Sequence, residues 1–265
     1  MTGVQTCALP ISADRLPGFV TFHDFELWYF QRNLHSPALE IHRKPREKEF
    51  TVLNRLHKSW RAAALADLRS QGILDHSYWS YCERPEEYNL DDCPIEVDMI
   101  SQLRYNTQKF LDGAPYFSDE LSDEERNNHS VLEPKYFVNA YFHIVLESQF
   151  DVDQSNGAFV TEKTFKPIKH GQPFFVAGGA GSLQVLRDLG YRVFDNVLDN
   201  SYDLEHNHTM RWIKLTQSIA AAKSQGVAEL FERCRADVEH NQQLFLASKA
   251  DRLNSLTRKI HEQYS

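Results

Sequence analysis

Apolar runs and helix signals alternate along residues 141–194, and this alternation constrains the fold more than any other feature of the chain. The continuous apolar run at 141–146 (YFHIVL) is typical of a strand that is covered on both faces. Thr161 is suited to cap the helix that follows, and residues 173–177 (PFFVA) form a second apolar run. A short helix at 183–189 then leads to a third run at 191–194. This order predicts a parallel α/β unit.

The part before residue 131 shows a sparser version of the same pattern. Residues 49–54 and 77–82 are strand candidates, and residues 59–71 and 95–111 have helical character. The polar stretch 121–130 (LSDEERNNHS) is typical of a linker or an exposed loop. We therefore expect an α/β protein with two Rossmann-like domains, at residues 13–130 and 131–265, and a helical tail from residue 209.

Residues 1–11 (MTGVQTCALPI) match, at every position, the translation of a common sequencing adapter read from a GTG start codon. We interpret residues 1–12 as an assembly scar from environmental DNA, and we expect the N-terminal domain to be truncated. Cys7 is then not a native residue. The other three cysteines form no CxxC pair, which favours a reducing compartment and argues against a zinc ribbon.

Length and charge exclude several classes of protein. The chain has 265 residues, 42% of them hydrophobic, and a formal net charge of -8. No run of ~18 apolar residues occurs, so we expect no membrane span and a cytoplasmic location. The acidic balance disfavours bulk binding of a polyanion, although a local basic channel stays open.

The strongest candidate for a functional site joins Glu147, the pair Glu162 and Lys163, and the glycine-rich stretch 178–182 (GGAGS). Glu147 ends one expected strand, the pair begins the next helix, and the glycines follow the next strand. All three therefore converge on the carboxyl edge of the sheet, where α/β proteins bind ligands. A lysine there can neutralise a pyrophosphate, and a glutamate can accept hydrogen bonds from hydroxyl groups. This is what a sugar-nucleotide site needs.

The stretch 144–183 resembles the donor-binding half of GT-B glycosyltransferases of the α1,3-fucosyltransferase type. That family has a strand ending in Glu-Asn-Ser and a helix that starts with Thr-Glu-Lys. This chain has Glu147-Ser148 at the first place, without the Asn, and keeps Thr161-Glu162-Lys163 at the second. Because the Asn is missing, the resemblance does not name the donor sugar.

A longer pattern is similar to uncharacterised glycosyltransferase-like proteins of large viruses and phages. It comprises TEKTFKPI, GQPF, GSL, LGY and residues 199–203 (DNSYD). The likeness covers roughly residues 49–215 and is specific in the second half and loose in the first, around Leu53-Asn54-Arg55 and Arg61. A viral or phage source would place the protein in the cytoplasm of the host cell.

The resemblance implies roles for individual residues. Lys163 would contact the donor pyrophosphate, Glu162 the ribose or the sugar, and Glu147 the same pocket, so that Glu147 and Lys163 are the candidate catalytic residues. Arg55 and Arg61 would reach the phosphates from the facing domain, or else be solvated surface residues. The other residues expected to bind the donor are Thr161, Lys166, Gly178, Gly179, Gly181, Ser182 and Tyr202.

The resemblance implies transfer of a sugar from a nucleoside-diphosphate sugar to an acceptor hydroxyl, with that donor as co-substrate and no metal or other cofactor. Two metal-binding alternatives are weaker: the Asp-x-Asp pair Asp151 and Asp153, and the His- and acid-rich stretch 203–208. Tyr202 is as well explained by a capped turn as by a nucleotide contact.

The general base is not identified by any motif. His23, Asp24 and Glu26 are guesses in the aromatic N-terminal segment, and the aromatic residues Trp28, Tyr29 and Trp60 could line an acceptor cleft or belong to the core.

The acceptor stays open between a glycan and a hydroxymethylated base in viral DNA, for which the basic stretch 43–48 (RKPREK) would be the contact. A third alternative is a non-catalytic module that binds a sugar nucleotide or a glycan.

Overall fold

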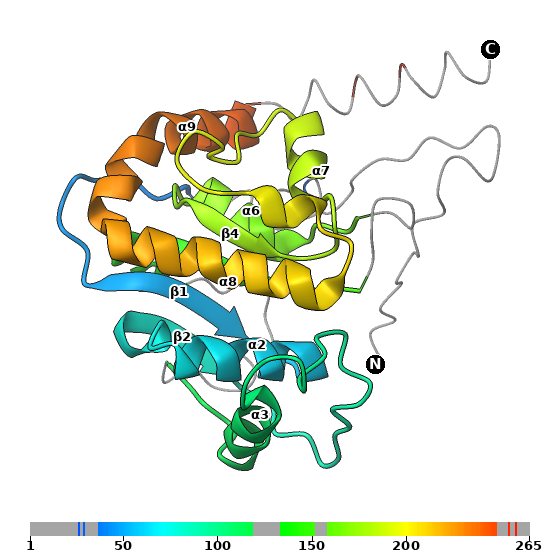
Figure 1. Cartoon of the computed structure of the whole chain (residues 1–265). Coiled ribbons are helices and arrows are strands. Elements are labelled where there is room, and N and C mark those ends of the chain that lie inside the picture. Colours follow the sequence, from blue (N-terminus) through cyan, green and yellow to red (C-terminus); the bar gives the residue numbers. More distant parts are fainter. Residues whose placement is uncertain are drawn as a thin grey trace, which may run out of the picture.

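One parallel sheet organises the molecule (Figure 1). The computed structural model describes residues 37–118, 133–151 and 158–247, together with Glu26, Tyr29, Asn254 and Arg258. Within these residues, four strands pair in the order β2-β1-β3-β4, and every neighbouring pair is parallel. The strands are β1 (Lys48–Asn54), β2 (Ser77–Tyr81), β3 (Ala140–Leu146) and β4 (Phe174–Ala177).

Helices follow each strand and cover the sheet. The described part contains α2 (Ser59–Ser70), α3 (Leu103–Asp112), α5 (Lys135–Val138), α6 (Glu162–Lys169), α7 (Ser182–Asp188), α8 (His208–Gln225), α9 (Val227–Ala247) and the 3-10 turns η2 (Leu74–His76) and η4 (Ser201–Leu204). None of these helices has both the length and the apolar character needed to cross a bilayer.

The two crossover connections leave the centre of the sheet in opposite directions. The chain runs from β1 through α2 to the outer strand β2, and from β3 through α6 to the outer strand β4. Because such crossovers are right-handed, α2 and α6 cover opposite faces. Helix α9 packs against α6 and β3, while Trp212 on α8 donates a 2.7 Å hydrogen bond to Asp67 on α2. In Figure 1, α2 and α3 lie below β1, and α7 and α9 lie above it.

The apolar run of β3 is a central strand, as its composition predicts. Phe142 and Ile144 face one side of the sheet and Val145 the other, and all three are buried. Phe142 packs between Phe50 of β1 and Phe175 of β4, with ring centroids 6.4 and 5.8 Å apart. Burial on both faces explains why this strand lacks the alternation of an exposed sheet.

The sheet differs from the expected arrangement in its extent. β1 and β3 are neighbours, so strands from both sides of the expected boundary at residue 130 share one sheet. Two separate sheets, one for each Rossmann-like domain, are therefore not found among the described residues. The expected linker 121–130 and the adapter-like residues 1–12 lie outside this part of the chain.

The expected third strand at residues 191–194 is not a strand. The side chain of Asn241 on α9 binds both backbone groups of Arg192, in the middle of this segment. Its Oδ1 accepts from the amide of Arg192 at 2.8 Å, and its Nδ2 donates to the carbonyl of Arg192 at 2.7 Å. The outer edge of β4 is partly closed as well, because the Tyr202 hydroxyl accepts from the amide of Val176. The expected helix at 95–111 starts only at Leu103.

Candidate functional site

The carboxyl ends of β1 and β3 form the topological switch point of the sheet. At such a point, the loops after two neighbouring strands turn to opposite faces and leave a crevice between them, where α/β proteins bind ligands. Here residues 55–58 lead into α2, and the chain from Glu147 onward, described except for residues 152–157, leads to Thr161 and α6. The site is thus flanked by two helix N-termini, whose backbone amides favour anions.

Thr161 begins α6, as its position in the sequence predicts. It is the N-cap with extended backbone, and its hydroxyl oxygen accepts a 3.4 Å hydrogen bond from the amide of Lys163. Capping of this kind satisfies one of the amide groups that the first helical turn leaves without a partner. The cap also fixes where the side chains of Glu162 and Lys163 emerge.

Glu147 binds the start of α6 to the end of β3. Its side chain is 0% exposed. Oε1 accepts hydrogen bonds from the Thr161 amide at 3.0 Å and the Thr164 hydroxyl at 2.6 Å, while Oε2 accepts from the Thr161 hydroxyl at 2.6 Å and the Ser148 amide at 3.3 Å. Both oxygens are fully used by the protein. The carboxylate therefore positions the site from inside instead of lining it, in contrast to the expected catalytic role.

Arg61 connects α2 to the same point from the opposite face. Its Nε and Nη2 donate to the backbone carbonyl of Glu147 at 3.2 and 2.8 Å, and Nη1 donates to the carbonyl of Leu56 at 3.4 Å. Burial lowers the pKa of Arg61, and the carboxylates of Glu147 and Glu162 act in the opposite direction. Arg61 is thus a buried residue that joins two loops, and the expectation of a solvated surface residue is wrong.

Lys163 is held by three oxygens at the mouth of this network. Its Nζ donates to Ser148 Oγ and Thr161 Oγ1 at 3.1 Å each and pairs with Glu162 Oε1 at 3.0 Å. Burial raises the pKa of Glu162, but Lys163 and Lys166 outweigh it and hold that pKa below its ordinary value. The carboxylate stays ionised near neutral pH and can accept hydrogen bonds from hydroxyl groups.

Lys166 differs from Lys163 because its ammonium group makes no direct contact with an acceptor among the described residues. It is partly buried one turn along α6 from Lys163, and no hydrogen bond or ion pair to its Nζ is formed within the described part of the chain. Burial lowers its pKa; Glu162 acts against this shift, and the cations Lys163 and Arg55 add to it. Arg55 from the β1 loop therefore lies close enough to Lys166 to interact with it electrostatically. Two lysines beside one carboxylate leave an excess of positive charge, which attracts an anion.

Hydrogen bonds within the fold occupy the amides at the end of the glycine-rich stretch and at the start of α7. The carboxylate of Asp203 accepts hydrogen bonds from the amides of Leu183 at 3.0 Å and Gln184 at 3.3 Å, and the carbonyl of Asp203 accepts from the amide of Gly181 at 2.8 Å. An internal carboxylate thus occupies the start of α7, where a phosphate was expected. Gly178, Gly179, Gly181 and Ser182 form a closed turn, in which Ser182 Oγ donates to Gly179 O at 2.7 Å.

Two of these glycines are required by the backbone. Gly181 has a φ of 85°, in the left-handed region that side chains rarely adopt, and a Cβ on Gly178 would lie 2.7 Å from Ser182 Oγ. Tyr202 is also structural, because it is 1% exposed and its hydroxyl is bound to the amide of Val176. Its hydroxyl is thus used within the fold, which favours the structural alternative over a nucleotide contact.

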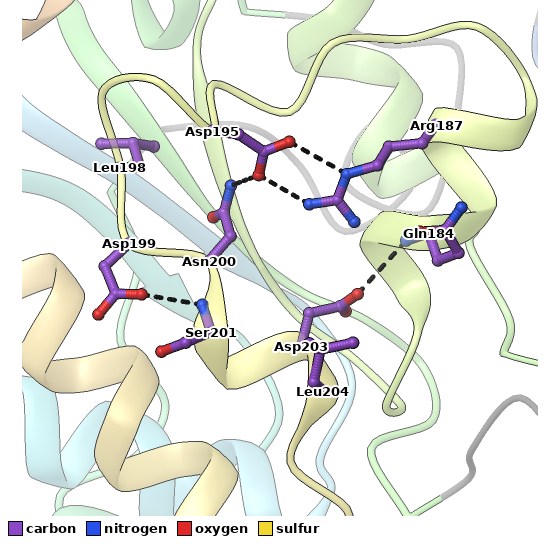
Figure 2. A pocket seen from close by; sticks show the side chains of 9 residues that line it. All are labelled: Gln184, Arg187, Asp195, Leu198, Asp199, Asn200, Ser201, Asp203 and Leu204. Atoms are coloured by element: carbon purple, nitrogen blue, oxygen red, sulfur yellow. Dashed lines mark hydrogen bonds and ion pairs between the residues drawn. The ribbon is translucent and has the colours of Figure 1, made fainter.

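A separate pocket of about 480 Å³ lies beyond β4, between α7 and η4, and shares no residue with the switch point (Figure 2). Figure 2 shows its polar groups paired within its wall. Arg187 binds Asp195 at 2.7 Å, and the Asp199 carboxylate accepts from the amide of Ser201 at 2.9 Å. With three aspartates and one arginine, this pocket suits a phosphate poorly.

The remaining candidates are buried or lie outside the described residues. Glu26 accepts a hydrogen bond from the buried Tyr191 hydroxyl, Tyr29 packs on Phe245, and Trp60 stacks on Phe150, so none of the three lines an open cleft. Not described are His23, Asp24, Trp28, Val152 and Asp153.

Two expectations remain, the basic stretch 43–48 and the two metal-binding alternatives, and the described residues limit both. In the basic stretch 43–48, Arg46 is buried and donates to the carbonyls of Phe137 and Ala140. Across residues 37–118, 133–151 and 158–247, no group of three or more His, Cys, Asp or Glu side chains is placed to hold a metal ion.

Sequence reasoning missed a group on the other side of Arg61. Asn54 ends β1 and pairs in register with Tyr81, the last residue of β2. His57 follows in the β1 loop, and its Nδ1 makes a hydrogen bond with the Tyr81 hydroxyl. The rule that ligands bind beyond strand carboxyl ends could have drawn attention to these residues, but no short motif marks them.

Comparison of the chain with protein-family models, with curated proteins and with solved structures found no match. The functional assignment therefore depends on the geometry of the switch point.

Proposed function

We propose that the chain is a glycosyltransferase that transfers a sugar from a nucleoside-diphosphate sugar to an acceptor hydroxyl. The observation that carries the proposal is the pair of lysines beside Glu162 at the start of α6: Lys163 is bound to its carboxylate, and the Lys166 ammonium lacks a hydrogen-bonding partner in the described residues. An unmatched cation beside a helix N-terminus suits a diphosphate group, and a neighbouring carboxylate suits the hydroxyls of a ribose or a sugar.

The pair of lysines fits the charge that develops in this reaction. As the bond between the anomeric carbon and the phosphate oxygen breaks, negative charge grows on the departing nucleoside diphosphate. Cations that are already in place stabilise that charge without reorganising during the step. Lys166 is the strongest candidate for direct contact, because the ammonium of Lys163 is already bound by Ser148, Thr161 and Glu162.

The domain organisation and the acceptor are two further parts of the proposal. GT-B enzymes place a second domain across from the donor site, and this two-domain organisation stays a prediction beside the single sheet that the described residues form. The acceptor is a glycan or, as the alternative, a hydroxymethylated base in DNA. The net charge of -8 favours the glycan, because DNA binding is governed by attraction to phosphates.

A binding and turnover panel tests the proposal. The protein is mixed with UDP-, GDP- and CDP-sugars, and binding is followed by calorimetry. Release of the nucleoside diphosphate is then measured with glycans, with hydroxymethylated DNA and with water as acceptors. We expect one donor class to bind, and Lys166→Met to weaken it about 10- to 100-fold, the effect of losing a hydrogen bond to a charged group. Lys109→Met, on the exposed face of α3, is the matched control.

Each outcome separates the alternatives. Turnover only with hydroxymethylated DNA would identify the acceptor as DNA. Tight donor binding without turnover by any acceptor or water would favour the non-catalytic module. If no sugar nucleotide binds, or if Lys166→Met binds its donor as well as the wild-type protein does, the proposed site is wrong.

A further inference from the structure

The switch point has a second side, around His57 and Tyr81, and Arg61 interacts with groups on both sides. The Arg61 guanidinium holds the carbonyl of Glu147 through Nη2 and the carbonyl of Leu56, next to His57, through Nη1. Arg61 also interacts electrostatically with Glu162 on one side and with Tyr81 on the other. The same guanidinium group therefore links the loop that carries His57 to the end of β3, where the proposed donor site begins.

His57 is fixed in place by two partners from the end of β2. Its Nδ1 is hydrogen-bonded to the hydroxyl of Tyr81, and its backbone amide donates to Glu83 Oε2. The imidazole ring is only partly buried, whereas Tyr81 is fully buried and packs against Phe110 on α3 with centroids 5.2 Å apart. Among the described residues, the other ring nitrogen, Nε2, has no partner. A histidine held through one nitrogen, with the other open, is the usual arrangement of a proton acceptor.

The charge state of the ring suits that task. Burial lowers the pKa of His57, and the Glu83 carboxylate raises it by a smaller amount, so the ring is neutral at pH 7. Burial also raises the pKa of Tyr81, with Glu83 adding to the shift and Arg61 opposing it, which keeps the phenol protonated. The charged and titratable groups around His57 are thus Glu83, Tyr81 and, beyond them, Arg61.

Asn54 supplies an independent sign that a ligand binds on this side. The residue is 5% exposed, and its Nδ2 is a buried donor with no partner among the described residues. It points to the same face as Tyr81, its register partner. A buried amide left without a hydrogen bond costs free energy, so its retention next to Tyr81, the partner of His57, favours a role in binding an oxygen atom of a ligand.

We propose that His57 is the general base of the transfer reaction and that the Asn54 amide binds an oxygen of the acceptor. The inference rests on the proposed function. In the reactive form, Nδ1 carries the ring proton and donates to Tyr81 Oη, which leaves the lone pair of Nε2 free. The acceptor oxygen forms its bond to the anomeric carbon while its proton moves to Nε2. The bond from that carbon to the phosphate oxygen breaks, and the electron pair leaves with the nucleoside diphosphate.

Donor binding and transfer are measured separately in His57→Gln. We expect the Kd for the donor to stay within about 3-fold of wild type and kcat to fall about 10²- to 10⁴-fold, the usual contribution of a general base. The wild-type kcat falls at acidic pH as His57 becomes protonated, and this limb disappears in the variant. In His57→Ala, added imidazole restores part of the lost rate, which a purely structural role would not allow. The exposed His76→Gln is the matched control.

Two further variants test the neighbours of His57. Tyr81→Phe keeps the buried ring and removes only the hydroxyl, so we expect an intact fold with a lower kcat and a shifted acidic limb. Asn54→Leu keeps the size of the side chain, and we expect it to raise KM for the acceptor about 10-fold while donor affinity stays unchanged. An unchanged KM would show that the acceptor does not contact Asn54.

The outcomes distinguish this inference from the proposal beneath it. If wild-type protein binds no sugar nucleotide, the proposed function fails, and the role of His57 falls with it. If the donor binds and turns over but His57→Gln keeps the wild-type kcat and its acidic limb, the glycosyltransferase proposal stands and the assignment of His57 is wrong.

Discussion

Arg61 on α2 donates two hydrogen bonds, at 3.2 and 2.8 Å, to the backbone carbonyl of Glu147 at the end of β3. This contact joins two loops that diverge at the switch point, from residues 86 positions apart in the chain. A charged donor that satisfies a buried carbonyl is worth more than a neutral one. The contact therefore holds α2 and the β1 loop against the end of β3.

Arg61→Met should destabilise the protein while keeping most of the aliphatic packing. The carbonyl of Glu147 loses both of its side-chain donors, so we expect the free energy of unfolding to fall by about 1.5–3 kcal/mol. Urea unfolding followed by circular dichroism measures this loss, with the exposed Arg84→Met as control. A loss below 0.5 kcal/mol, as is usual at surface positions, would contradict a joining role.

Glu147→Gln tests whether this residue positions the site or takes part in the chemistry. Four donors point at its two oxygens, and a glutamine would turn an NH₂ group toward one pair of them. We expect the free energy of unfolding to fall by about 2–3 kcal/mol because a buried donor loses its acceptor. The exposed Glu229→Gln on α9 should show no such loss. A variant as stable as wild type but inactive would instead restore the catalytic role expected from the sequence.

Asp203→Ala should weaken α7 without affecting the anion site. The carboxylate caps the amides of Leu183 and Gln184, and removal of such a cap costs about 1–2 kcal/mol. We expect the donor Kd to be unchanged, because the carboxylate lies beyond β4 instead of at the switch point. Thermal unfolding and calorimetry measure the two effects. Tighter donor binding in Asp203→Ala would show that the glycine turn does bind the diphosphate once its internal carboxylate is gone.

Local signals predicted the elements around the site, and long-range contacts decided the rest. The apolar run before Glu147 and the cap at Thr161 are visible within a few residues, so β3 and the start of α6 could be placed from the sequence. The meeting of Glu147 with Thr161 then follows from strand order. The start of α7 is capped by Asp203, which lies 20 residues away in the chain from its partner Leu183. Arg192 pairs with Asn241, which is 49 residues away. No periodicity records such contacts.

Candidate roles were harder to predict than positions. The Thr-Glu-Lys motif drew attention to Lys163, yet the structure shows its ammonium bound by three oxygens and that of Lys166 unmatched. A lysine's partners depend on side-chain geometry that the spacing of residues does not contain. The sequence predicted no role for His57 or Asn54 for the same reason, because their significance lies in which polar atoms stay without a partner.

Two buried histidines should make the protein sensitive to acid. Burial lowers the pKa of His143 to about 4 and that of His170 to about 3, from an ordinary value of 6.5. The unfolded chain therefore binds these protons first. Stability is fully present above pH 6.5 and is lost as the pH falls toward about 4, at up to about 1.4 kcal/mol per pH unit for each histidine.

His170→Phe separates this effect from general acid denaturation. His170 is 2% exposed beside Phe137, and neither ring nitrogen has a hydrogen-bonding partner among the described residues. A phenyl ring removes two unsatisfied polar atoms, so we expect stability at pH 7 to rise by about 1–3 kcal/mol. Urea unfolding at pH 7, 6 and 5 should also show that the free energy of unfolding depends less steeply on pH, because one of the two histidines no longer contributes. The exposed His76→Gln should change neither quantity. A pH slope that His170→Phe leaves at its wild-type value would mean that the ring of His170 is already protonated in the folded protein, in conflict with its apolar surroundings.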